Sequence, residues 1–373
     1  MSTPQATLYG EQTRLTVANM SFSGRRLADF PEFVRAAAQV KEAATAANLG
    51  AGLLDAGTAA RISSACRSLQ ADEHLDQFPV DVFHGGGGIG LNMNTNEVIA
   101  TLAGPDVDPA DHVNLSQSTN DACHTATRVA VYRAVGEFLD AIAALNGELR
   151  AVARRMDGVD TIARTCLQDG LPVAAGVLHT ALASALERQA ARLRTTADDL
   201  LQVTLGGTVI GSGAGADVRY RETVVGLLAG VTGLPLTPAP DLYDATQYPD
   251  DLARLSAGVA AISHTLAKYA ADLRLLSSGP ECGFGELSLP ATQAGSSFFP
   301  GKVNPVIPET VIACDLLVTG NDVVVQRCLG LGEGHLNLWD STMGFLLLEN
   351  LRMLTSAVRL FTSRCVAGIQ ASP

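Results

Sequence analysis

Hydrophobic residues recur at alternating steps of four and three along three long stretches of the chain. This spacing places them on one stripe of an α-helix and is typical of helices that pack lengthwise against other helices. The stretches carry Val131, Val135, Phe138, Ile142, Leu145 and Leu149; Leu255, Val259, Ile262, Leu266, Tyr269, Leu273 and Leu276; and Leu347, Leu351, Leu354, Val358 and Phe361. A fourth helix, rich in Ala and Leu, is predicted from about 172 to 203. We therefore expect an all-α fold built around a long helical bundle.

The N-terminal part of the chain has a different pattern. Shorter helices are predicted at 33–47 and 56–69, followed by a Gly-rich loop, HGGGGIGLNMNTNE, at 84–97. We therefore predict a smaller N-terminal helical domain, residues 1–113, that carries this loop, and a central helical-bundle domain, residues 114–373.

Polar and Gly-rich connectors separate the predicted bundle helices. They lie at 116–121 (SQSTND), 163–170 (ARTCLQDG), 205–217 (LGGTVIGSGAGAD) and 277–309. Because rigid helices can hold loops in place for chemistry, we expect the functional residues in these connectors.

The charge balance excludes some classes of partner. With 26 Lys and Arg against 38 Asp and Glu among 373 residues, the net charge is −12, and the basic residues form no cluster. We expect neither nucleic acid nor an anionic membrane as a partner. No apolar run approaches the roughly 20 residues that span a bilayer, and the N-terminus lacks a basic region followed by an apolar stretch. These features predict a soluble, cytoplasmic protein.

Cysteine and histidine give no sign of a metal site. The seven cysteines are scattered and contain no C-x-x-C pair, which predicts reduced thiols. The seven histidines never occur three or four residues apart, the spacing that would place two of them on one helical face. The glycine runs form no nucleotide-binding motif either. We predict neither a metal nor a cofactor.

The stretch GSSFFPGKVNP, at 295–305, has the densest set of reactive side chains. Lys302 is one of three lysines in the chain, and with Asn304 it could hold a carboxylate through charge-assisted hydrogen bonds. Ser118, Thr119 and Asn120 supply donors for a second carboxylate or an amide-like group. Taken alone, the same residue types are also the usual helix caps and turn formers.

Several motifs resemble one known family. Residues 295–309, GSSFFPGKVNPVIPE, are similar to the signature GSSxMPxKxNPxxxE of the aspartase/fumarase superfamily, with Phe299 in place of Met. Other stretches agree in the same order, namely YGEQT, GLNMNTNEVIA, DHVNLSQSTNDACHTAT, RTCLQD, GGTVIGSG and DLRLLSSGP. The last of these and SQSTND are most similar to the aspartase and class II fumarase branch. The resemblance implies a homotetramer whose bundle core is shared by all subunits and whose active sites each gather loops from three of them.

The resemblance also implies a reaction, the trans elimination of a substituent from a 2-substituted succinate to leave fumarate. The carboxylate beside the deprotonated carbon then takes up charge as an aci-carboxylate. By the motif match, Ser296 is the oxyanion base and Lys302 is the second catalytic residue. The match places substrate contacts at Asn304, Ser297, Ser118, Thr119, Asn120, Thr165, Cys166, Asn92 and Ile89.

Three substitutions depart from the family pattern. Cys166 stands where the family usually has a histidine, which in fumarases pairs with the glutamate matched by Glu309. Ile89 and the two preceding glycines stand where the family carries hydroxyl side chains. His124 stands at a usual proline, and we expect it to be a cap or surface residue rather than a replacement acid. Glu309 and His124 are therefore candidates for residues that act on the site through other side chains, without touching the substrate.

The substitutions bear on the substrate. A thiol is a poorer proton relay at neutral pH than an imidazole, so loss of hydroxide from malate is disfavoured. Ile89 offers no hydrogen bond to an ammonium group. We therefore expect a nitrogen leaving group that departs as a stable anion or weak base, with nitrosuccinate releasing nitrite as the sharpest example. The alternatives are an L-aspartate ammonia-lyase, a fumarate hydratase and a non-catalytic homologue. The family's usual C-terminal domain is expected to be absent, since the sequence stops at Pro373.

Overall fold

Helices make up most of the computed structural model, which describes residues 7–372. The chain forms two compact units, each assembled from three stretches. The first unit contains the described residues up to Ala134, with Ala197–Ala253 and Val324–Leu348. The second contains Val135–Thr196, Arg254–Val323 and the described residues from Glu349 onward. The predicted division at residue 113 stays a prediction.

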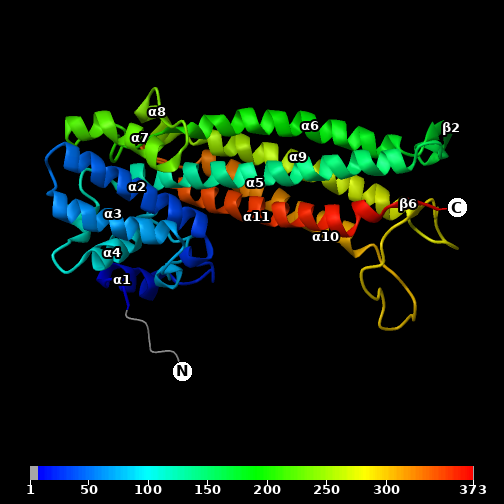
Figure 1. Cartoon of the computed structure of the whole chain (residues 1–373), viewed down its shortest axis with the longest axis horizontal. Helices are drawn as coiled ribbons and strands as arrows, with labels where there is room; N and C mark the ends of the chain where they lie inside the picture. Colours follow the sequence, from blue (N-terminus) through cyan, green and yellow to red (C-terminus); the bar gives the residue numbers. More distant parts are fainter. Residues whose placement is uncertain (1–6, 373) are drawn as a thin grey trace. The chain divides into compact units, whose positions relative to one another are not determined.

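The first unit is a cluster of mostly short helices. Its helices are α1 (Glu11–Met20), α2 (Pro31–Gly50), α3 (Ala56–Gln70), α4 (Ile89–Ala103), α7 (Val218–Thr232) and α8 (Leu242–Gln247). Helix α2 packs against α3 and α7, and α4 packs against α1 and α3 (Figure 1). The helices predicted at 33–47 and 56–69 are confirmed as α2 and α3. Small buried alanines along α2 allow the neighbouring helices to approach closely.

The Gly-rich loop is shorter than predicted. It ends at Gly88, and residues 89–97 belong to α4. Gly86, Gly87 and Gly88 have φ values of 95°, 62° and 86°, a left-handed conformation that residues with a Cβ rarely adopt. The expectation of a loop through residue 97 was wrong because its polar residues, among them Asn92 and Asn96, lie on buried faces of a helix.

The second unit is a bundle of long helices. It contains most of α5 (Thr119–Arg155), α6 (Val177–Asp198), α9 (Asp250–Leu276), α10 (Val306–Leu329) and α11 (Asp340–Arg364), which run side by side in Figure 1. His179 Nδ1 on α6 lies 2.7 Å from Tyr269 Oη on α9, and the Tyr269 ring packs edge-on against Phe361 of α11. Ser256 Oγ on α9 donates to Asp322 Oδ1 on α10 at 2.6 Å. The bundle core is thus apolar, with a few hydrogen bonds between polar side chains of neighbouring helices.

The predicted helical seams are confirmed. Every seam position except Leu276, which is half-buried, has a buried side chain. Helix α10 was not predicted, because its sequence is apolar nearly all round and shows no single stripe. The prediction of a helix from 172 was wrong at its start, since α6 begins at Val177.

Three short two-stranded sheets complete the described part of the fold. Strands β1 (Asp160–Thr165) and β2 (Gln168–Ala174) form an antiparallel hairpin. Strands β3 (Gln202–Val203) and β4 (Thr237–Pro238) pair in parallel, and β5 (Leu287–Ser288) pairs antiparallel with β6 (Gln370–Ala371). The hairpin was missed because it is mostly exposed and carries Pro172, which an isolated ribbon tolerates. Within residues 7–372, no helix has the length and hydrophobicity to cross a bilayer.

Candidate functional site

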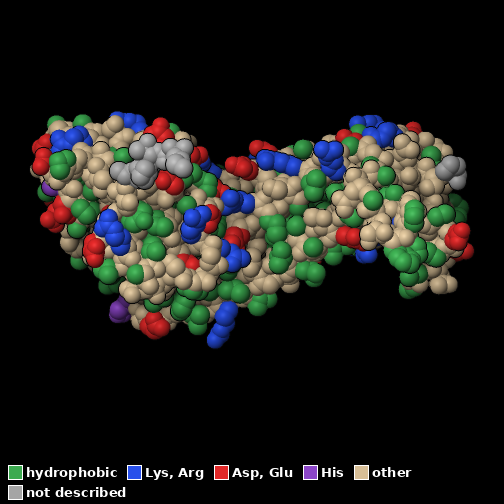
Figure 2. Space-filling view, turned by 90° about the horizontal axis from the view of Figure 1, so that it is seen from below, with side chains coloured by type: hydrophobic (Ala, Val, Ile, Leu, Met, Phe, Trp, Pro, Cys, Tyr) green, Lys and Arg blue, Asp and Glu red, His purple; other side chains and the backbone are tan. Residues whose placement is uncertain are grey.

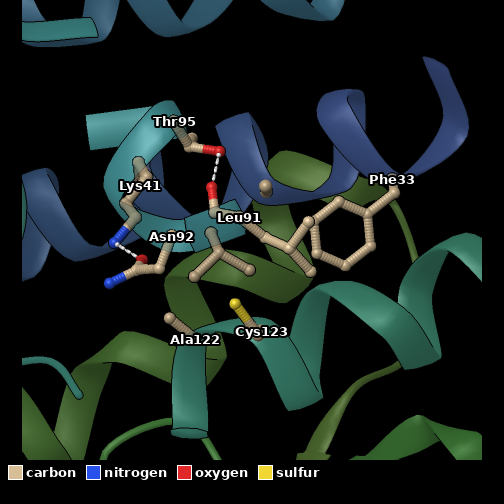
Figure 3. Close-up of a pocket in the computed structure, with 9 residues that line it drawn as sticks. Phe33, Lys41, Leu91, Asn92, Thr95, Ala122 and Cys123 are labelled. Carbon is tan, nitrogen blue, oxygen red and sulfur yellow. Dashed lines mark hydrogen bonds between the residues drawn. The ribbon is translucent and has the colours of Figure 1, made fainter. Parts of the chain in front are cut away.

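Three carboxamides meet in the first unit. The amide cluster consists of Asn92 and Asn96 on α4 and Asn114 just before α5. Asn114 Oδ1 accepts hydrogen bonds from Asn92 Nδ2 at 3.0 Å and from Asn96 Nδ2 at 3.1 Å. The buried ammonium of Lys41 on α2 donates to Asn92 Oδ1 at 2.8 Å and to Asn114 Oδ1 at 2.9 Å. Figure 3 shows Lys41 and Asn92 pointing toward each other beside a small cavity.

The amide cluster contacts the first turn of α5. Asn92 Nδ2 donates to Thr119 Oγ1 at 3.2 Å. Ser118 and Asp121 form a reciprocal cap at the start of this helix, since Ser118 Oγ accepts from the Asn120 N–H at 3.2 Å and Asp121 Oδ1 accepts from the Ser118 N–H at 2.9 Å. The capping alternative is therefore confirmed for Ser118. The cap does not involve the side chain of Thr119, which stays in contact with Asn92.

A second connector is tied to this helix start. Asp121 Oδ2 accepts hydrogen bonds from the Gly206 N–H at 3.1 Å and the Thr208 N–H at 3.0 Å. Asn120 Nδ2 donates to Val209 O at 2.9 Å. Hydrogen bonds thus join the Gly-rich connector 205–217 to the connector 116–121 within the first unit.

Burial changes the pKa values of the ionisable side chains at the start of α5. Asp121 is fully buried, and burial raises its pKa to about 6, although the backbone donors from Ser118, Thr208 and Gly206 and the charge of Lys41 act in the opposite direction. Burial also raises the pKa of the Cys123 thiol to about 12, so this thiol is neutral at pH 7. Lys41 and Asp121 are thus two buried groups of opposite charge in this part of the first unit.

His124 and Ile89 differ in exposure. The expectation that His124 is a cap or surface residue was wrong, because its side chain is 3% exposed, with Nε2 3.1 Å from Ala245 O and Nδ1 3.0 Å from Thr204 Oγ1. Burial and the charge of Arg128 hold the pKa of His124 well below its usual value, so it is neutral with both nitrogens occupied. Ile89 begins α4 and is 43% exposed, which leaves an apolar side chain at the mouth of the Gly-rich loop.

The second unit carries the signature loop. Ser296 Oγ accepts hydrogen bonds from the backbone N–H groups of Phe298, at 3.0 Å, and Phe299, at 2.9 Å. Two amide donors aimed at one hydroxyl oxygen favour its ionised form. Ser297 and Lys302 are exposed in the same loop. The arrangement can stabilise an alkoxide on Ser296.

The neck of this loop is closed by Asn304. Its Nδ2 donates to Gly295 O at 2.7 Å, and the Gly295 N–H donates to Lys302 O at 2.7 Å. A Cβ on Gly295 would lie 2.6 Å from the Asn304 backbone nitrogen, so only glycine fits there. The signature residues therefore form one closed loop with Lys302 and Ser296 on it.

Thr165 and Cys166 lie at the tip of the β1–β2 hairpin. Cys166 and Leu167 have φ values of 53° and 60°, which is the left-handed conformation of a two-residue hairpin turn. Neither residue is glycine, so the turn is strained. Cys166 is a free, exposed cysteine. The tip presents the Cys166 thiol to solvent.

Glu309 has a partner that the sequence did not reveal. It lies in the first turn of α10, and its Oε1 is 3.4 Å from Nη2 of Arg274 on α9. An arginine on α9 therefore lies beside this carboxylate.

The predicted site residues fall into two groups. The first unit holds Ile89, Asn92, Ser118, Thr119, Asn120 and His124, and the second holds Thr165, Cys166, Ser296, Ser297, Lys302, Asn304 and Glu309. Among the residues that the structure describes, no group of three or more His, Cys, Asp and Glu side chains is arranged to hold a metal ion.

Sequence reasoning missed several residues that organise these groups. Asn114 and Asp121 lie inside the quoted block 111–127 but were given no role, although Ser118 and Asp121 have the spacing of a capping box. Lys41 was given no role, yet its place among alanines and valines of a helix marks it as buried. Glu286, which pairs with Arg164, has no such local signal.

Comparison with protein families supports the motif match. Residues 1–320 match the family model described as Lyase. Among curated proteins, the aspartate ammonia-lyase of Corynebacterium glutamicum is 39% identical over 380 residues, which is 99% of this chain and 72% of that protein. The aspartate ammonia-lyase of Escherichia coli K12 is 38% identical over 380 residues, 99% of this chain and 80% of that protein.

Solved structures agree with this similarity. A fumarate lyase, delta crystallin, from Brucella melitensis bound to cobalt superimposes with a TM-score of 0.96 at 39% identity, covering 99% of this chain and 83% of that one. A class II fumarase from Schistosoma mansoni superimposes with a TM-score of 0.94 at 28% identity, with coverage of 99% and 83%. The similarity thus extends to the arrangement of the helices.

Proposed function

Because the chain belongs to the aspartase/fumarase superfamily and is a carbon–nitrogen lyase, we propose that it removes a nitrogen substituent from a 2-substituted succinate by trans elimination, leaving fumarate. Ser296 is the base. The observation that carries this proposal is the pair of backbone N–H groups, from Phe298 and Phe299, directed at Ser296 Oγ.

The two donors address the main difficulty of this chemistry. A serine hydroxyl is ordinarily too weak an acid to be ionised at neutral pH, and amide donors with a nearby cation favour its alkoxide. The alkoxide takes the proton from the carbon next to the leaving-group carbon. The electron pair of that C–H bond passes through the aci-carboxylate into the new double bond, and the C–N bond breaks with its pair on nitrogen.

Charge on the aci-carboxylate requires a cation, and we assign this role to Lys302. Its ammonium is exposed on the same closed loop as Ser296. Asn304 and Thr165 bind the same carboxylate, and Ser118, Thr119, Asn120 and Asn92, with Ser297, hold the other end of the substrate and the leaving group. Most catalytic stabilisation in such a site comes from donors placed before the reaction begins.

Two substrates remain in competition. The named relatives favour L-aspartate, whose ammonium leaves as ammonia without an added proton. The apolar Ile89 and the thiol of Cys166 favour nitrosuccinate, because nitrite leaves as a stable anion and its nitro group needs no charged acceptor. A fumarate hydratase is disfavoured, since hydroxide needs a proton donor and the buried neutral His124 has both nitrogens occupied.

We further propose a homotetramer in which each active site combines loops from several subunits. Helix α10 supports this assembly, because Leu316, Leu317 and Val323 are 69%, 60% and 64% exposed on it. Hydrophobic side chains also reach the surface among the charged ones on the face drawn in Figure 2. Exposed leucines of this size along a helix are typical of a subunit interface.

The test is fumarate formation, followed by its ultraviolet absorbance. The purified protein is assayed with L-aspartate, nitrosuccinate, malate and N-substituted aspartates at matched concentrations. Fumarate from a nitrogen-substituted succinate supports the lyase proposal, and the ratio of kcat/KM values selects the substrate. Turnover of L-aspartate at least equal to that of nitrosuccinate would exclude the nitrite-releasing activity as the main one. No fumarate from any of them would favour the non-catalytic homologue.

A further inference from the structure

Lys41 is a buried cation without a role in the proposed chemistry. Its side chain on α2 is 1% exposed, whereas lysine is seldom buried unless it is paired. Burial lowers its pKa to about 8, and the charge of Asp121 is among the effects that raise it. The ammonium is therefore protonated at pH 7.

The ammonium fixes the orientation of two carboxamides. Lysine only donates, so the groups that face its Nζ must be the oxygens of Asn92, at 2.8 Å, and Asn114, at 2.9 Å. The amide nitrogen of Asn92 must then point away from Lys41. It donates to Asn114 Oδ1 at 3.0 Å and to Thr119 Oγ1 at 3.2 Å.

This orientation determines what Thr119 can do. A hydroxyl carries one proton and two acceptor sites. Because the Asn92 amide donates to Thr119 Oγ1, the Thr119 proton is directed elsewhere. Thr119 is half-buried at the start of α5, so its hydroxyl is available to donate to a carboxylate outside the amide cluster.

We propose that Lys41 is a positioning residue for substrate binding, which acts through the Asn92 carboxamide to present the Thr119 hydroxyl as a donor to the substrate carboxylate. This inference rests on the proposed function, which gives Asn92 and Thr119 their contact with a dicarboxylate. Lys41 itself does not touch the substrate.

The negative charge that faces the influence of Lys41 is that of Asp121, which lies on α5 with Thr119. Asp121 is fully buried, and its carboxylate holds the backbone of Ser118, Gly206 and Thr208. The charge of Lys41 lowers the pKa of Asp121, and that of Asp121 raises the pKa of Lys41, so each favours the ionised form of the other. The other ionisable groups acting on Lys41 are the buried thiols of Cys123 and Cys66, whose pKa values burial raises. Lys41 is thus balanced by the residue that organises the helix start.

The first test compares Lys41→Met with Thr95→Val. Methionine has nearly the length of lysine without its charge or donors. Thr95 lines the same small cavity but donates only to Leu91 O in its own helix, so Thr95→Val is the matched control (Figure 3). We measure KM and kcat for fumarate formation and, by titration calorimetry, the Kd of succinate, which binds without reacting. Circular dichroism and gel filtration report folding.

Lys41→Met is expected to raise KM and the succinate Kd about tenfold, while kcat changes much less, because a uniform binding contact is lost. Thr95→Val is expected to stay within about twofold of the wild type in both. A folded Lys41→Met protein with wild-type KM and Kd would overturn the proposal. So would a loss confined to kcat.

Two further variants keep the test decisive if Lys41→Met fails to fold. In Asn92→Asp the carboxylate still accepts from Lys41 but cannot donate to Thr119, so the same rise in KM and Kd is expected in a packed core. The double variant Asn92→Asp/Thr119→Val should lose less affinity than the sum of the two single losses, because part of the effect of Asn92 acts through Thr119. Additive losses, or wild-type affinity in Asn92→Asp, would refute the linkage.

The outcomes separate this inference from the proposed function. Wild-type protein that binds succinate but forms no fumarate from any tested dicarboxylate would refute the proposed function alone, and the variants' succinate Kd values would still decide the role of Lys41. Wild-type protein that neither binds succinate nor forms fumarate would refute both.

Discussion

Arg164 in β1 and Glu286, just before β5, form an ion pair within the second unit. Arg164 Nη1 donates to Glu286 Oε2 at 3.1 Å, and Thr161 Oγ1 donates to the same oxygen at 3.1 Å. The guanidinium also lies 4.6 Å from the centre of the Phe284 ring. These contacts anchor the hairpin whose tip carries Thr165 and Cys166, although the strained turn itself is exposed.

Glu286→Gln is expected to loosen this hairpin. Arg164 holds the pKa of Glu286 below its usual value, so the stabilisation is present above the ordinary carboxyl pKa and is lost as pH falls through the lowered one. We expect the variant to lose about 1 kcal/mol at pH 7. Denaturant unfolding at pH 7 and pH 3 measures it, with the exposed Glu281→Gln as control. Equal differences from the wild type at both pH values would contradict the prediction.

Ser296→Ala is expected to abolish turnover without unfolding the protein. The hydroxyl accepts hydrogen bonds from two backbone amides of its own loop, and loss of the proposed base should cost kcat roughly a thousandfold or more. Steady-state fumarate formation measures the loss, and circular dichroism measures the fold. Thr292→Ala, in the exposed segment before the loop, serves as control. Retention of activity in Ser296→Ala would remove the proposed base.

Asp121 predicts a pH dependence of stability. Burial raises its pKa from 3.8 to about 6, so the folded chain binds a proton that the unfolded chain releases between these values. Its favourable contribution is therefore complete below pH 3.8 and is lost as pH rises through 6. The free energy of unfolding of the wild type, relative to Asp121→Asn, should fall by up to about 3 kcal/mol from pH 4 to pH 7. Urea unfolding measures it, and a constant difference would contradict the assignment.

The sequence predicted the parts of the fold that depend on one-dimensional periodicity. The seams around Phe138, Ile262 and Leu354 have one apolar stripe each, and all three are buried as expected. Helix α10 was not predicted, because it is apolar on several faces and shows no single stripe. The β1–β2 hairpin was not predicted, because two exposed strands show little alternation of hydrophobic and polar residues. In addition, Glu286, which anchors the hairpin, is more than a hundred residues away in the sequence.

The candidate site was predicted by motif rather than by geometry. The backbone donors on Ser296 follow from the turn that the loop adopts, and serine's own identity does not specify that turn. The roles of Lys41 and Asp121 depend on burial by segments distant in sequence, such as the connector at 206–208. The expected surface position of His124 was wrong for the same reason. Its side chain on α5 is buried against the segment that contains Ala245, which is distant in sequence.

Leu316→Glu is expected to weaken the proposed oligomer. Leu316 is 69% exposed on α10, so a charge there does not disturb the subunit core but would be buried without a partner in an assembled bundle. Gel filtration with light scattering should show smaller species and reduced activity for this variant. Val218→Glu, at the exposed start of α7, is the control. A wild type that is already monomeric, or an unaffected variant, would contradict the shared-site assembly.

Cys166→His and Ile89→Thr test what determines the leaving group. Cys166→His restores an imidazole at the hairpin tip, which can donate or relay a proton near neutral pH, whereas the thiol cannot do so efficiently. Ile89→Thr restores a hydroxyl that can hydrogen-bond an ammonium group or a carboxylate at the exposed start of α4. We expect each change to raise kcat/KM for L-aspartate or malate relative to nitrosuccinate, and the double variant to shift the ratio by about tenfold or more. Cys166 is exposed and Ile89 is 43% exposed, so we expect both variants to fold, and thermal unfolding can verify this. An unchanged ratio of kcat/KM values in a folded double variant would mean that neither position selects the leaving group. The substrate preference would then have to come from Ser118, Asn120 or Ser297.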